Sequence, residues 1–216
     1  MLLGGCATGP LYQKLTPRDV VVIPEARISK TFHSSDRTDA GIEFGASRAS
    51  GKTEVEAQGS GQVRLGDTTF TGPQLFTTTF DFAMYDLSLR WREFMRDLPF
   101  GYEFTGGLGY ANLKMALSST TGRATESVSS PVFRMRLGGI WRVVPSTRIE
   151  LGVTAIGTKS VFDRIGGVDV SIAQTLGPHL TLRGGYLNWQ VDSPGTSRSR
   201  IELRFYGPSV GLGLHF

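Results

Sequence analysis

From Ala40 to Phe216 the chain repeatedly alternates apolar and polar residues, so that every second side chain is apolar. The run Tyr85-Asp86-Leu87-Ser88-Leu89-Arg90-Trp91 alternates at every step. This period of two predicts β-strands with one apolar and one polar face. Eight segments carry it: 40–48, one ending at 91, one beginning at 102, 133–141, 149–155, one around 168–172, one around 180–186, and 200–216. We therefore expect an all-β fold.

The connections between these segments alternate in length, which is how outer-membrane β-barrels are laid out, with short periplasmic turns and longer outer loops. Short turns are expected at Met95–Gly101, Val144–Thr147 and Leu176–His179, whereas Ser50–Thr79 and Ser118–Ser130 read as longer polar loops. No apolar run approaches the roughly 18 residues of a transmembrane helix. An even strand count would leave both termini of the barrel at its periplasmic end.

The last segment ends in an aromatic residue after strict alternation, with apolar side chains at Val210, Leu212, Leu214 and Phe216. This ending resembles the C-terminal assembly signal that the barrel insertion machinery recognises in outer-membrane proteins. Residues 40–216 thus resemble the small eight-stranded outer-membrane barrels, the group of the OmpA transmembrane domain and the OmpW-like proteins. The resemblance is one of pattern. It implies an eight-stranded antiparallel transmembrane β-barrel in contact with outer-membrane lipid.

The N-terminus carries the only cysteine, so an intramolecular disulfide is excluded. Leu3-Gly4-Gly5-Cys6 resembles a bacterial lipobox, although no basic segment or full apolar segment of a signal peptide precedes it. Lipidation of Cys6 is one interpretation, and a chance cysteine in a flexible terminus is the other. We expect residues 1–39 to be a lipobox and an extended periplasmic tether, with at most a short strand at Val20–Ile23, and residues 40–216 to be the barrel.

An apolar face turned to lipid would leave charged side chains in the lumen of the barrel. Buried charges must pair, so we expect a salt-bridged network that plugs the lumen. Its members would be Glu43, Asp86, Arg90, Glu103, Arg134, Arg136, Glu150, Asp169 and Arg183. Hydration of some of these residues near the rims is the alternative.

Aromatic residues predict the two borders of the membrane-facing belt. The outer girdle would be Tyr85, Tyr110, Tyr186 and Tyr206, and the periplasmic girdle Trp91, Phe104, Trp141 and Phe216. Beyond each tyrosine the apolar parity changes. Without a β-bulge, the residues there would face inward and line an apolar cup for a lipid or another hydrophobic ligand. With bulges they would face outward. A third possibility is that they are loop residues that pack on one another. The cup would consist of Phe80, Phe82, Met84, Leu113, Met115, Leu187, Trp189, Leu203 and Phe205.

Four functional interpretations follow. A structural or surface-interaction barrel with a plugged lumen comes first, and a hydrophobic-ligand barrel or small-solute conduit second. A lipid-modifying enzyme needs a nucleophile with a base in reach, and none of His33, His179 or His215 has an evident partner. A lipid-anchored lipocalin would place charged residues outside, whereas the polar face here is rich in Gly, Ser and Thr. We expect no cofactor and no metal, and the scattered arginines with a net charge of +4 argue against nucleic acid.

Overall fold

The structure is a computed structural model that describes residues 11–15, 22–57, 62–65, 68–71, 74–158, 164–193 and 199–216. These residues form an all-β fold, and none of them belongs to a helix long and apolar enough to cross a membrane. The strands are β1 (Leu11–Leu15), β2 (Ile23–Ser34), β3 (Thr38–Ala57), β4 (Gln62–Leu65), β5 (Thr68–Thr71), β6 (Gln74–Phe94), β7 (Phe100–Ser119), β8 (Gly122–Val144), β9 (Thr147–Thr158), β10 (Arg164–Leu176), β11 (Leu180–Ser193) and β12 (Ser199–His215).

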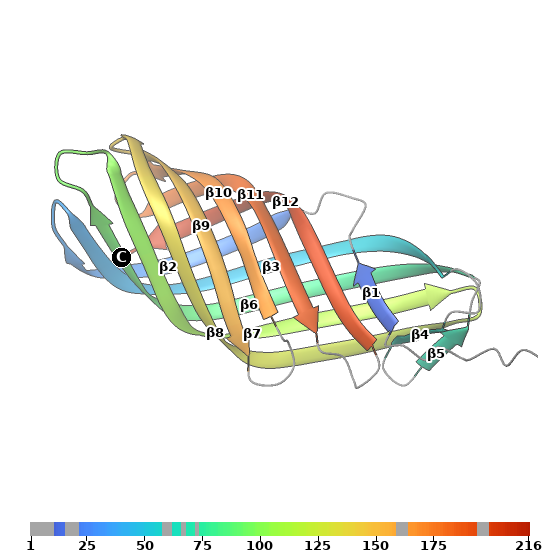
Figure 1. Ribbon diagram of the computed structural model, residues 1–216. Coiled ribbons are helices and arrows are strands. Elements are labelled where there is room, and N and C mark those ends of the chain that lie inside the picture. Colours follow the sequence, from blue (N-terminus) through green and yellow to red (C-terminus); the bar gives the residue numbers. More distant parts are fainter. Residues whose placement is uncertain are drawn as a thin grey trace, which may run out of the picture.

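Nine of these strands close into a barrel in the order β2-β3-β6-β7-β8-β9-β10-β11-β12, with β12 returning to β2 (Figure 1). All eight expected strands are present, as β3 and β6 to β12. The expected count of eight is nevertheless wrong, because β2 adds a ninth strand from the segment interpreted as a tether. The expectation of a wholly antiparallel barrel is also wrong, since β12 and β2 pair in parallel, with Ser209 opposite Ile23 and His215 opposite Ser29.

Four neighbouring strands are longer than the other five strands of the barrel and continue past it as a four-stranded extension (Figure 1). Strands β3, β6, β7 and β8 contain 20 to 23 residues, whereas the other five contain 12 to 17. The segment Ser118–Ser130, expected as a loop, is a hairpin whose strands end at Ser119 and begin again at Gly122. The other expected loop, Ser50–Thr79, also contains strand ends and the hairpin β4–β5. Phe70 of that hairpin packs edge-on against Phe76, with ring centroids 5.5 Å apart.

The three expected short turns all lie at the other end of the barrel, beside the C-terminal residue. The turn between β10 and β11 places Gly177 at φ 73°, a left-handed conformation that glycine adopts without strain.

Strand β1 pairs in parallel with the beginning of β12, Leu11 opposite Ser199. Leu11–Leu15 therefore lie at the end opposite Phe216. Both termini of the barrel were expected at one end because an even number of antiparallel strands was expected. With nine strands and a parallel closure between β2 and β12, this reason no longer holds.

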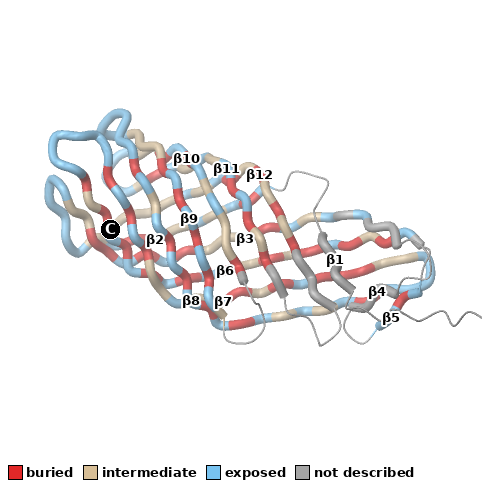
Figure 2. Tube along the Cα trace, in the orientation of Figure 1, coloured by how far each residue is buried: buried red, intermediate tan, exposed pale blue. Residues whose placement is uncertain are grey.

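Burial alternates along the strands of the barrel where it is described, so the barrel has two distinct faces (Figure 2). The outward side chains around the middle of the barrel are large and apolar, and Leu108, Leu137, Leu151 and Val210 are more than half exposed. The inward side chains fall into two zones. Charged residues fill the half near the C-terminus, and aromatic and aliphatic residues fill the half near the extension.

Candidate functional site in the barrel lumen

The charged zone of the lumen begins with a pair of arginines that share one glutamate. Arg27 Nη1 lies 2.5 Å from Glu43 Oε1, and Arg90 Nη1 lies 3.5 Å from Glu43 Oε2. Arg90 also donates to Asp39, at 2.9 Å, and to the hydroxyl of Thr31, at 3.3 Å. These contacts link β2, β3 and β6, three consecutive strands of the barrel wall, on its inner face.

Glu103 of β7 is the centre of the network. Its Oε2 accepts a hydrogen bond of 2.5 Å from Arg92 Nε, and its Oε1 is bound by Arg136 Nη1. Arg136 in turn donates to Asp169 through Nε and Nη2, the latter at 2.8 Å. Arg136 and Glu103 are both 2% exposed. A buried carboxylate is costly unless it is paired, and here two guanidinium groups bind the single carboxylate of Glu103.

Two further clusters complete the charged zone. Glu150 is held between Arg148, at 2.5 Å, and Arg183, at 2.7 Å. Nearer the extension, Arg134 Nη1 lies 2.9 Å from both oxygens of Asp86, and the Ser88 hydroxyl donates to Asp86 at 2.7 Å. The lumen at this level is filled by side chains that bind one another.

All nine residues expected in the network take part in ion pairs inside the barrel. Sequence reasoning missed five others: Glu25, Arg27, Asp39, Arg92 and Arg148. With them the described network contains seven carboxylates and seven guanidinium groups, so its formal charge is balanced. The alternation could have indicated Arg92 and Arg148. Each lies two residues from Arg90 or Glu150 on the same strand and therefore points to the same, inner face. Glu25 and Arg27 were missed because β2 was not recognised as a strand.

His215 links the two strands of the parallel closure. Its Nδ1 lies 2.7 Å from the Ser29 hydroxyl on β2, and its Nε2 lies 2.8 Å from the Thr181 hydroxyl on β11. The backbone N–H of Phe216 donates to the Ser29 carbonyl at 3.0 Å. A serine beside a histidine is one element of a nucleophilic triad, but here the second ring nitrogen meets a threonine in place of a carboxylate. This geometry indicates a structural role, in which the His215 side chain links β12 to β2 and β11. His33 and His179 are exposed.

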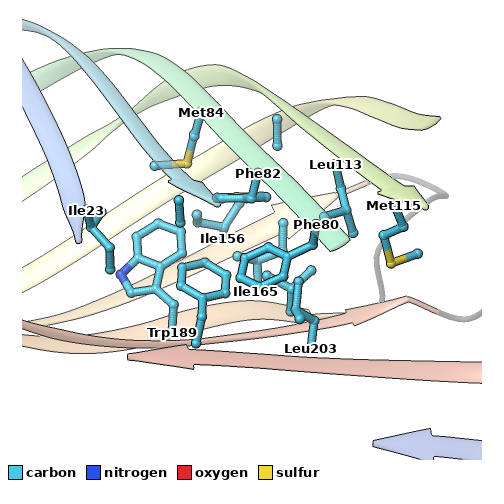
Figure 3. Packing of buried hydrophobic residues seen from close by; sticks show 14 of the residues in the cluster. Ile23, Phe80, Phe82, Met84, Leu113, Met115, Ile156, Ile165, Trp189 and Leu203 are labelled. Atoms are coloured by element: carbon cyan, nitrogen blue, oxygen red, sulfur yellow. The ribbon is translucent and has the colours of Figure 1, made fainter. Parts of the chain in front are cut away.

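The second zone of the lumen is apolar, and its residues pack on one another (Figure 3). The rings of Phe82, Trp189 and Phe205 lie within 5.7 to 6.3 Å of each other, and Phe80 stacks on Phe205 at 5.8 Å. The strand registers on both sides of Tyr85, Tyr110, Tyr186 and Tyr206 continue without a shift. No bulge therefore turns these residues outward, and every residue expected to line the cup is buried.

The aromatic residues expected in the two girdles point outward. Tyr85 lies opposite Tyr110 in the ladder, and Tyr186 stacks with Tyr206, with centroids 6.5 Å apart. Near the other end Trp91 lies opposite Phe104, and Trp141 stacks with Phe100 at 5.8 Å. Beyond the tyrosines the outer face becomes polar: Arg48 binds Asp81 at 2.6 Å, and Asn112 binds Ser129 at 3.0 Å.

In the C-terminal segment, Val210 and Leu212 face outward and Phe216 is exposed. Cys6, the residue of the expected lipidation, lies outside the described residues. Within the described ranges, no three His, Cys, Asp or Glu side chains are grouped so that they could hold a metal ion.

Comparisons with protein-family models, with curated proteins and with solved structures found no match to this chain. The family suggested by the alternating pattern is therefore supported here only at the level of a closed all-β barrel.

Proposed function

We propose that this chain is an outer-membrane β-barrel with a sealed lumen, which anchors the four-stranded extension at the cell surface. The observation that carries the proposal is the inside-out distribution of side chains. Large apolar residues are exposed all around the middle of the barrel, and paired charges are buried within it. Soluble monomers rarely expose contiguous apolar patches larger than a few hundred Å².

The borders of the apolar belt fit a bilayer. On β12 the distance from Tyr206 to Phe216 corresponds to about ten residues, which is the length of a tilted membrane-spanning strand. Tyrosines border the belt towards the extension, and tryptophans and phenylalanines border it towards the short turns. The same features argue against a lipocalin, whose barrel interior is apolar and whose outer surface is charged.

The orientation follows from the connections. Because outer-membrane barrels keep short turns on the periplasmic side, we infer a periplasmic C-terminal end and an extension that lies, with β4–β5, outside the cell. The partners of this arrangement are outer-membrane lipid and the barrel insertion machinery, which would read Val210, Leu212, Leu214 and Phe216. Lipidation of Cys6 would add an anchor to the segment that precedes β1, although Leu11–Leu15 lie at the extension end and not at the periplasmic end expected for the tether.

A structural or surface role suits this barrel better than a conduit, because salt bridges and stacked rings fill consecutive zones of the lumen. The test has two parts. On gels of purified outer membranes, the band of the wild-type protein should shift on boiling, and deletion of Phe216 should abolish the shift. Purified barrels in planar bilayers should pass no steady current. A soluble protein without a heat-dependent shift would contradict the membrane assignment, and a stable open channel would contradict the sealed lumen.

A further inference from the structure

Two arginines face each other at the mouth of the barrel beside the short turns. Arg142 of β8 and Arg148 of β9 are direct partners in the antiparallel ladder, just before a register shift towards Val144. Like charges directly opposite each other on neighbouring strands destabilise a sheet. Something must offset their repulsion for this pairing to be favourable.

The two arginines line a hollow of about 470 Å³, counted to its open mouth. Its lining also includes Arg92, Asp39, Ser146 and Thr147. The hollow therefore brings three guanidinium groups together with a single carboxylate. Since Arg92, Arg148 and Asp39 belong to the charge-balanced network of the lumen, Arg142 adds one further positive charge at its mouth.

Within the hollow, Arg142 is the cation for which the described residues provide no ion partner. Arg92 is bound to Glu103 and Arg148 to Glu150, each at 2.5 Å. Arg142 forms no ion pair with any described residue; its guanidinium carbon instead lies 3.3 Å from the centroid of the Phe94 ring. This stacking fixes the plane of the guanidinium and leaves its N–H groups available at the edge of the hollow.

We propose that this hollow is a binding site for a phosphate group, held between Arg142 and Arg148. Planar guanidinium groups bind phosphate oxygens through paired hydrogen bonds, and a phosphate anion between the two arginines would attract both and so offset their repulsion. The Ser146 and Thr147 hydroxyls border the same hollow. The phosphate can belong to a free phosphate compound or to the headgroup of a phospholipid beside the barrel mouth. The site does not depend on the sealed lumen or on the role of the extension.

The test uses the full chain in a non-ionic, phosphate-free detergent. Sodium phosphate should raise the midpoint of thermal unfolding relative to sodium chloride at the same ionic strength, and calorimetric titration should give a saturable isotherm. Arg142→Gln should raise the Kd for phosphate at least tenfold. Because Arg142 is exposed and bears no salt bridge among the described residues, the variant should fold. Arg96→Gln is the matched control: this arginine lies in the turn at the same end but outside the hollow, and its substitution should leave binding unchanged.

A charge reversal separates binding from folding. Arg142→Glu would replace the facing like charges with an ion pair to Arg148, in addition to the one that Arg148 forms with Glu150. The unfolding midpoint of this variant without phosphate should therefore rise, while phosphate binding disappears. Competition between inorganic phosphate and short-chain phosphatidylglycerol identifies the source of the group: displacement by the lipid indicates a headgroup, and its failure indicates a free phosphate compound. The proposal is overturned if phosphate does not stabilise the wild type beyond chloride, or if Arg142→Gln binds phosphate as tightly as the wild type.

Discussion

The Ser29 hydroxyl on β2 lies 2.7 Å from Nδ1 of His215 on β12, and this hydrogen bond joins the first and last strands of the closed barrel. The imidazole continues the link to the Thr181 hydroxyl at 2.8 Å. Parallel strand pairs are slightly less stable per residue than antiparallel ones. Side-chain hydrogen bonds across the closure therefore supplement a ladder of only seven residue pairs.

Removing the His215 side chain should weaken the pairing of β12 with β2. His215→Ala deprives the buried Ser29 hydroxyl of its histidine partner, and we expect a loss of about 1–3 kcal/mol in the free energy of unfolding. Urea titration followed by tryptophan fluorescence measures the loss. His33→Ala, at an exposed position of the same strand β2, should change stability by less than about 0.5 kcal/mol. Equal effects of the two substitutions would show that His215 has no special role in the closure.

The buried pair Arg134–Asp86 should be far more sensitive to single substitutions than an exposed pair. Arg134→Met leaves the Asp86 carboxylate buried with only Ser88 as a partner among the hydrogen bonds described here, at a cost of about 3–5 kcal/mol. Adding Asp86→Leu should restore most of the stability, because an apolar pair leaves no buried charge. Failure of the second substitution to rescue the first would contradict this explanation.

The exposed pair Arg48–Asp81 on the extension is the matched comparison. The hydrogen bond from Arg48 lowers the pKa of Asp81 below its usual value. A carboxylate with a lowered pKa stabilises the fold above its unfolded pKa, and this contribution disappears as the pH falls through the folded value. Since both side chains are accessible to water, Arg48→Ala should cost less than about 1 kcal/mol near neutral pH. Chemical unfolding at pH 7 checks the cost, and a loss as large as that from Arg134→Met would contradict the role of burial.

Close approach of two strands should make one glycine irreplaceable. A Cβ atom at Gly107 of β7 would lie 2.1 Å from the backbone oxygen of Leu87 on β6, so the strands would have to separate. Gly107→Ala should therefore destabilise the barrel, by about 1–3 kcal/mol. Gly139→Ala on β8 is the control, because a Cβ there meets no atom within 4 Å. Heat-modifiability and unfolding midpoints of the two variants can be compared directly, and indistinguishable values would contradict the close approach.

The alternation of residues predicted eight strands, β3 and β6 to β12, and the inward direction of the charged residues, because a period of two is set by the strand itself. It did not reveal β2. Pro24 and the charged residues Glu25 and Arg27 make that segment resemble a tether, although Ala26 and Ile28 occupy its outward positions. Pairing in parallel with β12 depends on contacts about 185 residues apart along the chain, which no local pattern encodes.

The length of the strands was also beyond the local pattern. Between Ser118 and Ser130 the sequence is rich in Ser and Thr, which suggested a loop. In the structure these residues form a hairpin whose outward face is polar and whose inward face carries Ala124 and the half-buried Val128. The arginine pair at the barrel mouth was missed for a related reason. Arg142 and Arg148 face each other only because of the register between β8 and β9. The sequence of either strand by itself does not determine this register.

Lipid quenching of single tryptophans tests the central claim most directly. Trp91 and Trp141 face outward, with 46% and 44% exposure, whereas Trp189 is 5% exposed inside the lumen. Variants that keep one tryptophan each, with the other two replaced by Phe, can be reconstituted in vesicles containing brominated phosphatidylcholine. The membrane-embedded, inside-out barrel predicts strong quenching of Trp91 and Trp141 and little quenching of Trp189. Quenching of none of the three would show that the apolar belt does not face lipid, and preferential quenching of Trp189 would contradict the assignment of the two faces.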